Sequence, residues 1–368
     1  MNKKLIALAV AGAIASPLAA QAGTLTTANM DITLSGGATG GYSYNSDTGR
    51  DKFIVDDALI DLSSEAMTGG MGVTLGIGTL TGNSLAGASN LGVIGASSGT
   101  SSTSTTSVQY GYVTVKPTNE LTVDAGKIAT NVGYEVVPSY ANGNILRGMV
   151  WNAQPTYYTG ARGTYSMGGM SFYVEANKDA VVSSSITNST NAAGGAIGAS
   201  GSFGGVDASF SYFSDTNEKN IYDFIFSTNV GGIDLAANID FQQLAKAQKK
   251  VAYNPNWVIG QDDNAYGVAL YATVPLSGNW SLPIRFEYVD DGTSGIYGFQ
   301  YKNPTTSKLE ANKATSLSVT PTYNFSSSTF VRAELAYVST DKKSTFVDDK
   351  GVLTDSNIVV GAQGGVLF

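Results

Sequence analysis

The chain has 368 residues and a formal net charge of −8, and only 14% of its residues are charged, compared with about 25% in typical soluble domains. It has 44 glycines but no cysteine and no histidine, which excludes disulfide frameworks, thiolate and imidazole metal sites, and histidine-dependent catalysis. Because the chain lacks these residues, we expect neither an enzyme nor a cofactor or metal site. No apolar run reaches the length of about 18 residues that a membrane-spanning helix requires, so we do not expect a helical membrane protein.

The amino terminus has the three parts of a secretory signal peptide. Two lysines at positions 3 and 4 give a positive start, residues 5–18 are mainly apolar, and Ala-Gln-Ala at 20–22 is a small-x-small cleavage site. We therefore expect a cleaved signal over residues 1–22 and a single mature domain over residues 23–368. Removal of the two lysines changes the formal charge from −8 to −10, an acidic balance that does not suit a nucleic-acid partner.

After the signal, apolar and polar residues alternate with a period of two. Successive side chains of a strand point to opposite faces, so this pattern predicts strands with one apolar and one polar face. The clearest examples are residues 233–242, 280–288, 317–325 and 331–337. Because strands of a parallel sheet are apolar on both faces, the pattern favours an antiparallel sheet.

Sixteen strands are predicted in this way, near residues 29–44, 52–65, 69–81, 106–117, 119–128, 156–167, 169–178, 194–203, 205–214, 219–230, 232–243, 263–275, 279–290, 312–325, 328–340 and 356–368. Their connections alternate between tight turns, for example at Gly168, Gly204 and Gly231, and long or variable loops such as residues 129–155. This asymmetry is typical of an antiparallel up-and-down transmembrane β-barrel, whose strand number is even in bacterial single-chain examples. Residues 295–301 are either an additional strand or an ordered part of the seventh long loop.

The carboxyl terminus forms a strand whose alternate residues are mainly apolar from Ile358 to Phe368. A closing strand in lipid needs a partner on each side, because an unsatisfied backbone group there costs several kcal/mol. Outer-membrane barrels commonly end in such a strand with a final phenylalanine, so Phe368 resembles the signal that the barrel assembly machinery reads. Together with the signal peptide, this ending indicates a multi-pass β-barrel in the outer membrane of a Gram-negative bacterium.

A stretch of about forty residues, 126–165, resembles the signature region of the OmpL-like beta-barrel porin-2 family of outer-membrane proteins. The matching features are a Gly-Lys strand end, a Gly-Tyr-Glu loop, an asparagine-containing segment, an arginine and a strand with Thr-Gly, at Gly126-Lys127, Gly133-Tyr134-Glu135, Asn142 to Asn144, Arg147 and Thr159-Gly160. Tyr158 departs from the family, which carries a histidine there, so any role of that histidine does not transfer. The resemblance implies an outer-membrane porin.

In sixteen-stranded porins the third loop folds into the lumen and narrows it, so the resemblance implies the same for residues 129–155. Glu135 and Arg147 would then lie at the pore constriction and face Arg162. Opposed charges across a narrow passage create a transverse field that filters hydrated solutes. The alternative is that Glu135 and Arg147 form a structural ion pair that pins the loop to the wall.

Alternation also assigns inner and outer faces. The residues expected to face lipid are Leu235, Ile284, Phe325, Leu335 and Phe368. The charged residues expected on the inner face are Asp61, Asp124, Glu175, Asp207, Asp223, Asp234, Asp240, Glu287 and Glu334, with Arg162, Arg285 and Arg332. Acids outnumber bases in this set, so we expect a mild preference for cations. Each of these residues, taken singly, is more often a member of an ion-pair ladder than a binding site.

The leading interpretation is a porin that lets small hydrophilic solutes and ions diffuse through a water-filled channel, because a barrel of sixteen strands encloses a lumen too wide for side chains to fill. The alternative is a structural or adhesive barrel whose external loops carry the function. Expected partners are membrane lipid, the barrel assembly machinery, and further copies of the chain in a homotrimer. Lys246, Lys249 and Lys250 either meet lipopolysaccharide phosphates or form a solvated charge run.

Overall fold

The computed structural model describes residues 23–26, 31–46, 49–80, 85, 106–182, 193–216, 218–246, 261–343, 346–348 and 350–368. The expected signal peptide, residues 1–22, lies outside this part of the chain, as do Lys249 and Lys250. Across the described residues, no helix has the length and apolar character needed to cross a membrane.

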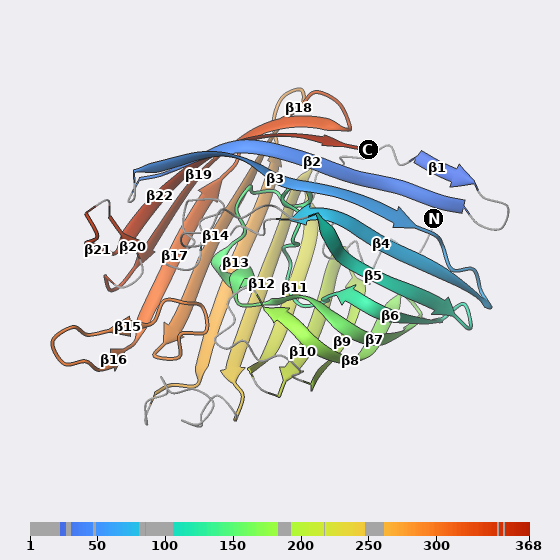
Figure 1. Ribbon diagram of the computed structural model, residues 1–368, viewed down its shortest axis with the longest axis horizontal. Helices are drawn as coiled ribbons and strands as arrows, with labels where there is room; N and C mark the ends of the chain where they lie inside the picture. Colours follow the sequence, from blue (N-terminus) through green and yellow to red (C-terminus); the bar gives the residue numbers. More distant parts are fainter. Residues whose placement is uncertain are drawn as a thin grey trace.

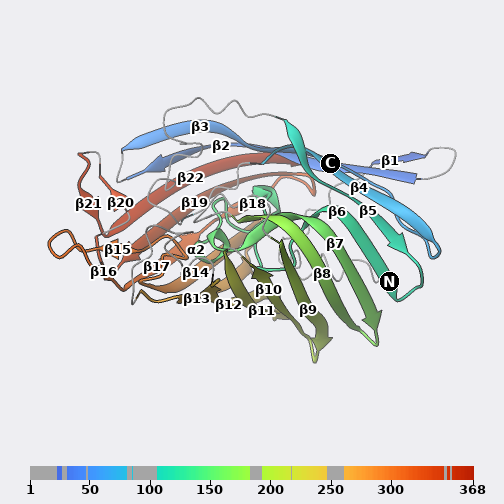
Figure 2. The ribbon, with the colours of Figure 1, turned by 60° about the horizontal axis from the view of Figure 1, so that its bottom comes forward.

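The strands form one antiparallel sheet that closes on itself into a barrel (Figure 1, Figure 2). The barrel strands are β2 (Asp31–Asn45), β3 (Arg50–Ser63), β4 (Gly70–Leu80), β5 (Ser107–Lys116), β6 (Leu121–Ala129), β7 (Pro155–Met167), β8 (Met170–Val182), β9 (Ala193–Phe203), β10 (Val206–Asp215), β11 (Lys219–Val230), β12 (Ile233–Leu244), β13 (Asn264–Pro275), β14 (Trp280–Gly292), β17 (Asn312–Val319), β18 (Thr322–Asn324), β19 (Thr329–Thr340) and β22 (Ser356–Leu367). Because β17 and β18 are two halves of one strand between β14 and β19, the wall has the sixteen strands that the sequence predicts. The short β1 (Gly23–Thr26) pairs with β2 as an extension.

The strand predicted over residues 312–325 is interrupted at Thr320 and Pro321. Proline cannot donate to a sheet ladder and is confined to edges and irregularities. Here the Thr320 N–H donates to the Pro283 carbonyl (2.8 Å), and the Pro321 carbonyl accepts the Ala333 N–H (3.1 Å). These two bonds keep β17 and β18 in line across the interruption.

Three of the tight turns are glycine pairs, Gly168-Gly169, Gly204-Gly205 and Gly231-Gly232, in which every φ lies between 58° and 88°. Positive φ at two successive residues is the requirement of a type I′ hairpin turn, and glycine meets it without steric cost. The connections at the other end of the barrel include the much longer residues 130–154 and 293–311. The predicted asymmetry between the two ends is therefore confirmed.

Exposure alternates along the strands as the sequence predicts. In β14, Arg285 and Glu287 are fully buried, whereas Phe286 between them is 44% exposed. In β19, Glu334 is buried and the adjacent Leu335 is 55% exposed. Apolar residues therefore cover the outer surface of the barrel, which is the arrangement that lipid requires.

The last strand, β22, pairs with both β19 and β2 and closes the barrel. The Phe368 N–H donates to the Gly36 carbonyl (3.1 Å), and the Gly36 N–H donates back to the Phe368 carbonyl (2.9 Å). The terminal residue thus takes part in closure, while its role as an assembly signal stays a prediction.

The connection after β14 does not add a barrel strand. Asp291, at the end of β14, accepts the N–H groups of Tyr297 (3.0 Å) and Phe299 (2.8 Å) and holds this part of the loop in place. The following β15 (Tyr301–Lys302) and β16 (Leu309–Glu310) pair with each other in a separate hairpin. In the connection after β19, β20 (Phe346–Val347) and β21 (Leu353–Thr354) form a second separate hairpin. Residues 295–301 are thus mainly an ordered part of the seventh long loop.

Candidate pore constriction

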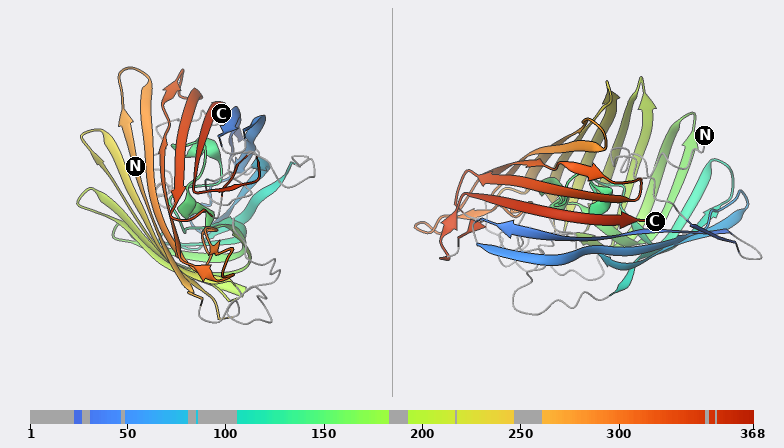
Figure 3. Two further views of the ribbon diagram at one scale, coloured as in Figure 1. Left: turned by 90° about the vertical axis from the view of Figure 1, so that its left-hand side faces the viewer. Right: turned by 90° about the horizontal axis from the view of Figure 1, so that it is seen from above.

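The connection between β6 and β7, residues 130–154, carries the short helices η1 (Ser139–Ala141) and α2 (Met149–Asn152). We call this connection the third loop. η1 contacts β2 and β3, and α2 contacts β13 and β14. Figure 3 shows the loop in green between the orange and red strands and the blue strands.

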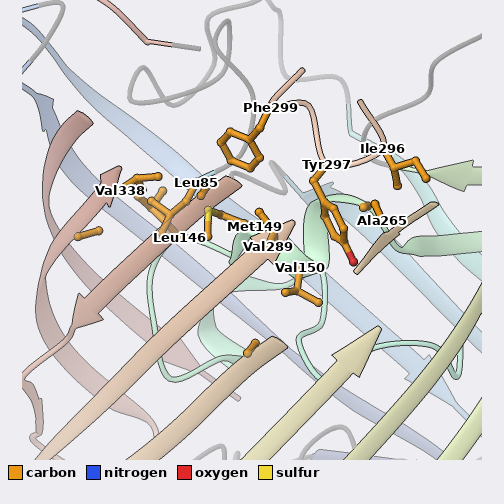
Figure 4. Close-up of a cluster of buried hydrophobic side chains, with 14 of the residues drawn as sticks. Leu85, Leu146, Met149, Val150, Ala265, Val289, Ile296, Tyr297, Phe299 and Val338 are labelled. Carbon is orange, nitrogen blue, oxygen red and sulfur yellow. The ribbon is translucent and has the colours of Figure 1, made fainter. Parts of the chain in front are cut away.

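Apolar side chains of the third loop form a buried cluster with neighbouring loops and the wall (Figure 4). Leu146, Met149 and Val150 come from the third loop, and Ile296 and Tyr297 come from the connection after β14. Burying one large apolar side chain contributes about 1.5–3 kcal/mol. The cluster therefore favours a single packed arrangement of the two loops.

Carboxylates of the inner wall accept backbone N–H groups of the third loop. A buried loop without a regular ladder needs such acceptors, because an unpaired buried donor costs about 1–3 kcal/mol. Four strands supply one carboxylate each: Gly133 N–H donates to Asp223 (3.0 Å), Ser139 N–H to Asp57 (2.6 Å), Leu146 N–H to Glu334 (2.9 Å) and Val150 N–H to Glu287 (3.0 Å). Most acids in this set were predicted on the inner face, and their observed partners are loop amides.

Glu135 is buried and binds the wall through Arg285. One carboxylate oxygen lies 2.6 Å from Arg285 Nη1, and the other accepts the Gly148 N–H (2.7 Å). Burial raises the pKa of Glu135, and the adjacent guanidinium acts against this shift. Arg285 also lies 3.3 Å from Glu287, so one fully buried cation joins a loop carboxylate to a wall carboxylate.

Arg147 is buried but does not pair with Glu135. Its guanidinium donates to the carbonyls of Ile145 (3.1 Å) and Val137 and lies 5.8 Å from the Trp151 ring centre. For the described residues, the structure records no ion pair between Arg147 and Glu135. The predicted ion pair between Glu135 and Arg147 is therefore wrong. Glu135 pairs with Arg285 of the wall, and Arg147 binds carbonyl groups within the third loop.

Arg162, on β7, belongs to a different cluster. It forms an ion pair with Glu175 (2.9 Å) and donates to the Tyr158 hydroxyl (2.7 Å), which itself donates to Glu175. The structure records no contact between Arg162 and Glu135 or Arg147 among the described residues. Tyr158, where the family carries a histidine, thus stabilises the Arg162–Glu175 pair.

Arg332 of β19 holds the turn around η1. Its guanidinium donates to the carbonyls of Ser139 (2.9 Å) and Asn142 (2.7 Å) and to Gln363 of β22 (2.6 Å). The inner position of Arg332 was predicted, whereas Gln363 was not. Gln363 lies at a polar position of the last strand, and this position could have identified it.

Asp56 and Asp57 are buried acids that the alternation pattern misses: Asp57 accepts Ser139 of the third loop, and Asp56 accepts Gln363 of the wall. Both are buried, although adjacent strand residues normally point to opposite faces. The register between β2 and β3 shifts at Thr39 and Gly40, and such a bulge sets two residues against one and turns neighbouring side chains to the same face. Two adjacent aspartates in a strand that otherwise alternates are the feature of the sequence that could have indicated the bulge.

Two parts of the inner wall differ in their relation to the third loop. Hydrogen bonds between described loop residues and wall side chains reach β2, β3, β10–β12, β14, β19 and β22, which we call the anchoring wall. In the described chain, none is recorded to side chains of β4–β8, which we call the exposed wall. On the exposed wall the inner side chains Tyr112, Thr114, Asp124 and Arg162 are partly exposed, whereas Tyr158 and Glu175 are buried.

Two further residues predicted to line the lumen differ in burial and in their contacts with the third loop. Asp240 is buried and accepts Gln154 of the third loop (2.9 Å). Asp234 is partly exposed near a tight turn, where Asn229 donates to it (2.7 Å). Among the residues that the structure describes, no group of three or more acidic side chains is placed to hold a metal ion.

Comparisons with known proteins extend this picture. The family model "Putative beta-barrel porin-2, OmpL-like" matches residues 31–368. No curated protein matches the chain by sequence.

Several solved structures are similar in fold. The outer membrane channel DcaP of Acinetobacter baumannii is 14% identical with a TM-score of 0.61, covering 94% of this chain and 100% of that one. The anion-selective porin from Comamonas acidovorans is 13% identical with a TM-score of 0.58, covering 92% and 99%. The trimer form of in-vitro folded OmpT, an outer membrane protein of Vibrio cholerae, is 10% identical with a TM-score of 0.55, covering 92% and 99%.

Sequence identities of 10–14% support only a similarity of fold. The family model, by contrast, matches the chain from β2 to residue 368. The chain is a closed sixteen-stranded barrel of the Gram-negative outer membrane and belongs to the OmpL-like beta-barrel porin-2 family.

Proposed function

We propose that the protein is a passive diffusion channel for small hydrophilic solutes and ions, and that the third loop lies in the lumen and narrows it. The observation that carries this proposal is that Asp57 of β3 and Asp223 of β11 hold the same loop. These two strands lie on opposite sides of the closed sheet in the strand order, and both side chains are buried on its polar face. A loop that both can reach has wall on either side of it.

Solutes would pass between the third loop and the exposed wall. The loop is hydrogen-bonded to the anchoring wall, whereas Tyr112, Asp124 and Arg162 on the exposed wall are partly exposed. In this arrangement Glu135 and Arg147 hold the loop side of the constriction, and Arg162 lies on the side of the exposed wall.

The mild cation preference is proposed from Asp61 and Asp124. Both are partly exposed and are hydrogen-bonded by hydroxyl groups, from Tyr110 and Thr114. The charge of Arg162 is engaged by Glu175. A carboxylate along a confined passage attracts cations more strongly than it would in bulk water.

The proposal assigns no catalytic role to the chain. The apolar outer surface would contact membrane lipid, and a homotrimer is proposed because a trimer form exists among the similar folds. Lys246, at the start of the long connection after β12, is proposed to meet lipopolysaccharide phosphates, and Phe368 is proposed to be read by the assembly machinery.

Single-channel recording in planar bilayers tests the channel and the loop together. Wild-type protein should give discrete conductance steps, and deletion of residues 136–146 should enlarge them, because the loop is not part of the strand ladder. Deletion of residues 303–308, at the tip of the β15–β16 hairpin, is the matched control and should leave conductance unchanged. Heat-dependent migration in gels verifies that each barrel is folded.

A folded wild-type barrel that stays electrically silent would contradict the channel and favour the structural or adhesive alternative. Steps of equal size with and without residues 136–146 would contradict the constriction while leaving the channel intact. A salt gradient then tests selectivity, and a reversal potential of the anion-selective sign would contradict the cation preference.

A further inference from the structure

Two carboxylates face each other across β11 and β12. Asp223 and Asp240 are directly opposite in the strand register, and both are fully buried. The amide nitrogen of Asn238 donates to Asp223 and lies 3.4 Å from Asp240 Oδ1. Like charges directly opposite in a sheet are destabilising, and burial removes the water that would screen them.

The same group of side chains holds both ends of the third loop. At the start of the loop, the Gly133 N–H donates to Asp223 (3.0 Å). At its end, the Gln154 amide donates to Asp240 (2.9 Å) and to Asn238 (3.0 Å). The carboxylate pair is therefore the point at which the two ends of the loop are joined to the wall.

Few charges are available to balance the pair. Lys219 of β11 is a cation that acts on Asp240, but its ammonium donates to the Ala153 carbonyl. The structure records no ion pair between Lys219 and either aspartate within the described part of the chain. The other titratable groups that act on the pair or on Lys219 are acids and phenols: Tyr173 of β8, Asp215 of β10, Glu218, and Asp291 and Tyr297 at and after the end of β14.

We propose that Asp223 and Asp240 share one proton and that this proton makes the attachment of the third loop, and hence the constriction, dependent on pH. Two buried carboxylates that lie opposite each other and share the Asn238 amide cannot both ionise without a large cost, and such pairs commonly retain one proton between them. With one proton the pair carries a single negative charge, which the positive charge of Lys219 balances. This inference rests on the proposed role of the third loop in a channel.

Loss of the shared proton leaves two adjacent negative charges against one positive charge. Repulsion between the aspartates then separates the acceptors of Gly133 and Gln154, and both ends of the loop loosen. The expected result is brief increases in conductance whose frequency rises with pH, by about tenfold per unit until the proton is lost, because one proton leaves in each event. The proton belongs to the pair and not to one residue.

The experiment is single-channel recording of the whole protein from about pH 5 to about pH 10, a range that includes the values carboxyl pairs reach when buried. Wild type should show the rising frequency of brief openings. Asp240→Asn cannot lose the proton and keeps an oxygen that can accept the Gln154 amide. Its brief openings should therefore stay as rare at every pH as those of wild type at low pH. Asp223→Asn should do the same, and this second variant protects the test if one of the two misfolds.

Asp207→Asn is the matched control, because Asp207 lies on the adjacent β10, is partly exposed and contacts Ser202. It should follow wild type at every pH. A conducting wild type whose fluctuations do not change with pH, or an Asp240→Asn variant with the wild-type pH dependence, would overturn the shared proton. Fluctuations that respond to calcium and chelator at constant pH would assign the pair to a metal ion and also overturn it. A silent wild type would instead contradict the channel itself.

Discussion

The anchoring wall and the exposed wall have the same polar alternation, but among the described residues only side chains of the anchoring wall are hydrogen-bonded to the third loop. Glu287 and Glu334, on the anchoring wall, are buried and accept loop N–H groups. Asp124, on the exposed wall, is partly exposed and accepts the Thr114 hydroxyl (2.7 Å). An inward carboxylate therefore has no fixed role in this barrel: it accepts loop N–H groups where the third loop packs against it and hydroxyl groups of the wall where the loop does not.

The largest expected effect comes from removing the cation of the anchoring wall. Arg285→Ala leaves Glu135, Glu287 and Glu334 without their shared partner, and breaking a buried pair in this way costs about 3–5 kcal/mol. Arg162→Ala is the counterpart on the exposed wall, and it should cost less because Arg162 serves a single carboxylate and keeps some exposure. Urea unfolding of both folded barrels measures the difference, and equal losses would remove the distinction between the walls.

The next effect concerns the outer face, where the two walls should not differ. Ile284→Arg on β14 and Val113→Arg on β5 both place a charge in lipid, which costs about 2–4 kcal/mol near the bilayer midplane. Folding yields into lipid vesicles should fall similarly for the two variants. A large reduction for one and none for the other would mean that the register of the tolerant strand is shifted by one residue.

A smaller effect is expected where the third loop begins. Gly133 has φ +91°, and a Cβ there would lie 2.0 Å from Gln154 Oε1, so Gly133→Ala should destabilise the loop by about 1–3 kcal/mol. Gly163→Ala on β7 is the control, since the nearest atom to its Cβ is 4.0 Å away. Limited proteolysis should cut the third loop faster in Gly133→Ala alone. Unchanged cleavage would mean that this end of the loop tolerates the strain.

The smallest effect is on selectivity, where a partly exposed charge contributes less than about 1 kcal/mol. Asp124→Asn should reduce cation preference slightly with little change in conductance. Glu135→Gln should leave the sign and size of the reversal potential nearly unchanged, because Glu135 is buried against Arg285. A stronger response to Glu135→Gln than to Asp124→Asn would place the charge that sets selectivity on the third loop and not on the exposed wall.

The barrel follows from local features of the sequence. Alternation over residues 280–288 and 331–337 predicted which side chains face outward, and Gly168, Gly204 and Gly231 predicted tight turns at one end. These features are local: side-chain direction in a strand depends on position alone, and a type I′ turn depends on two residues. A barrel in lipid has no free edge, and the pairing of β22 with both β19 and β2 meets this requirement.

Only the tertiary structure decided what the inward charges do. Alternation placed Arg285 and Glu334 inside, but their partners lie more than a hundred residues away, on a loop whose path is set by the closed sheet. The bulge that turns Asp56 and Asp57 to one face depends on pairing with β2. The physical reason is that a period of two specifies the face of each residue, whereas burial and hydrogen bonding depend on which distant segment covers that face.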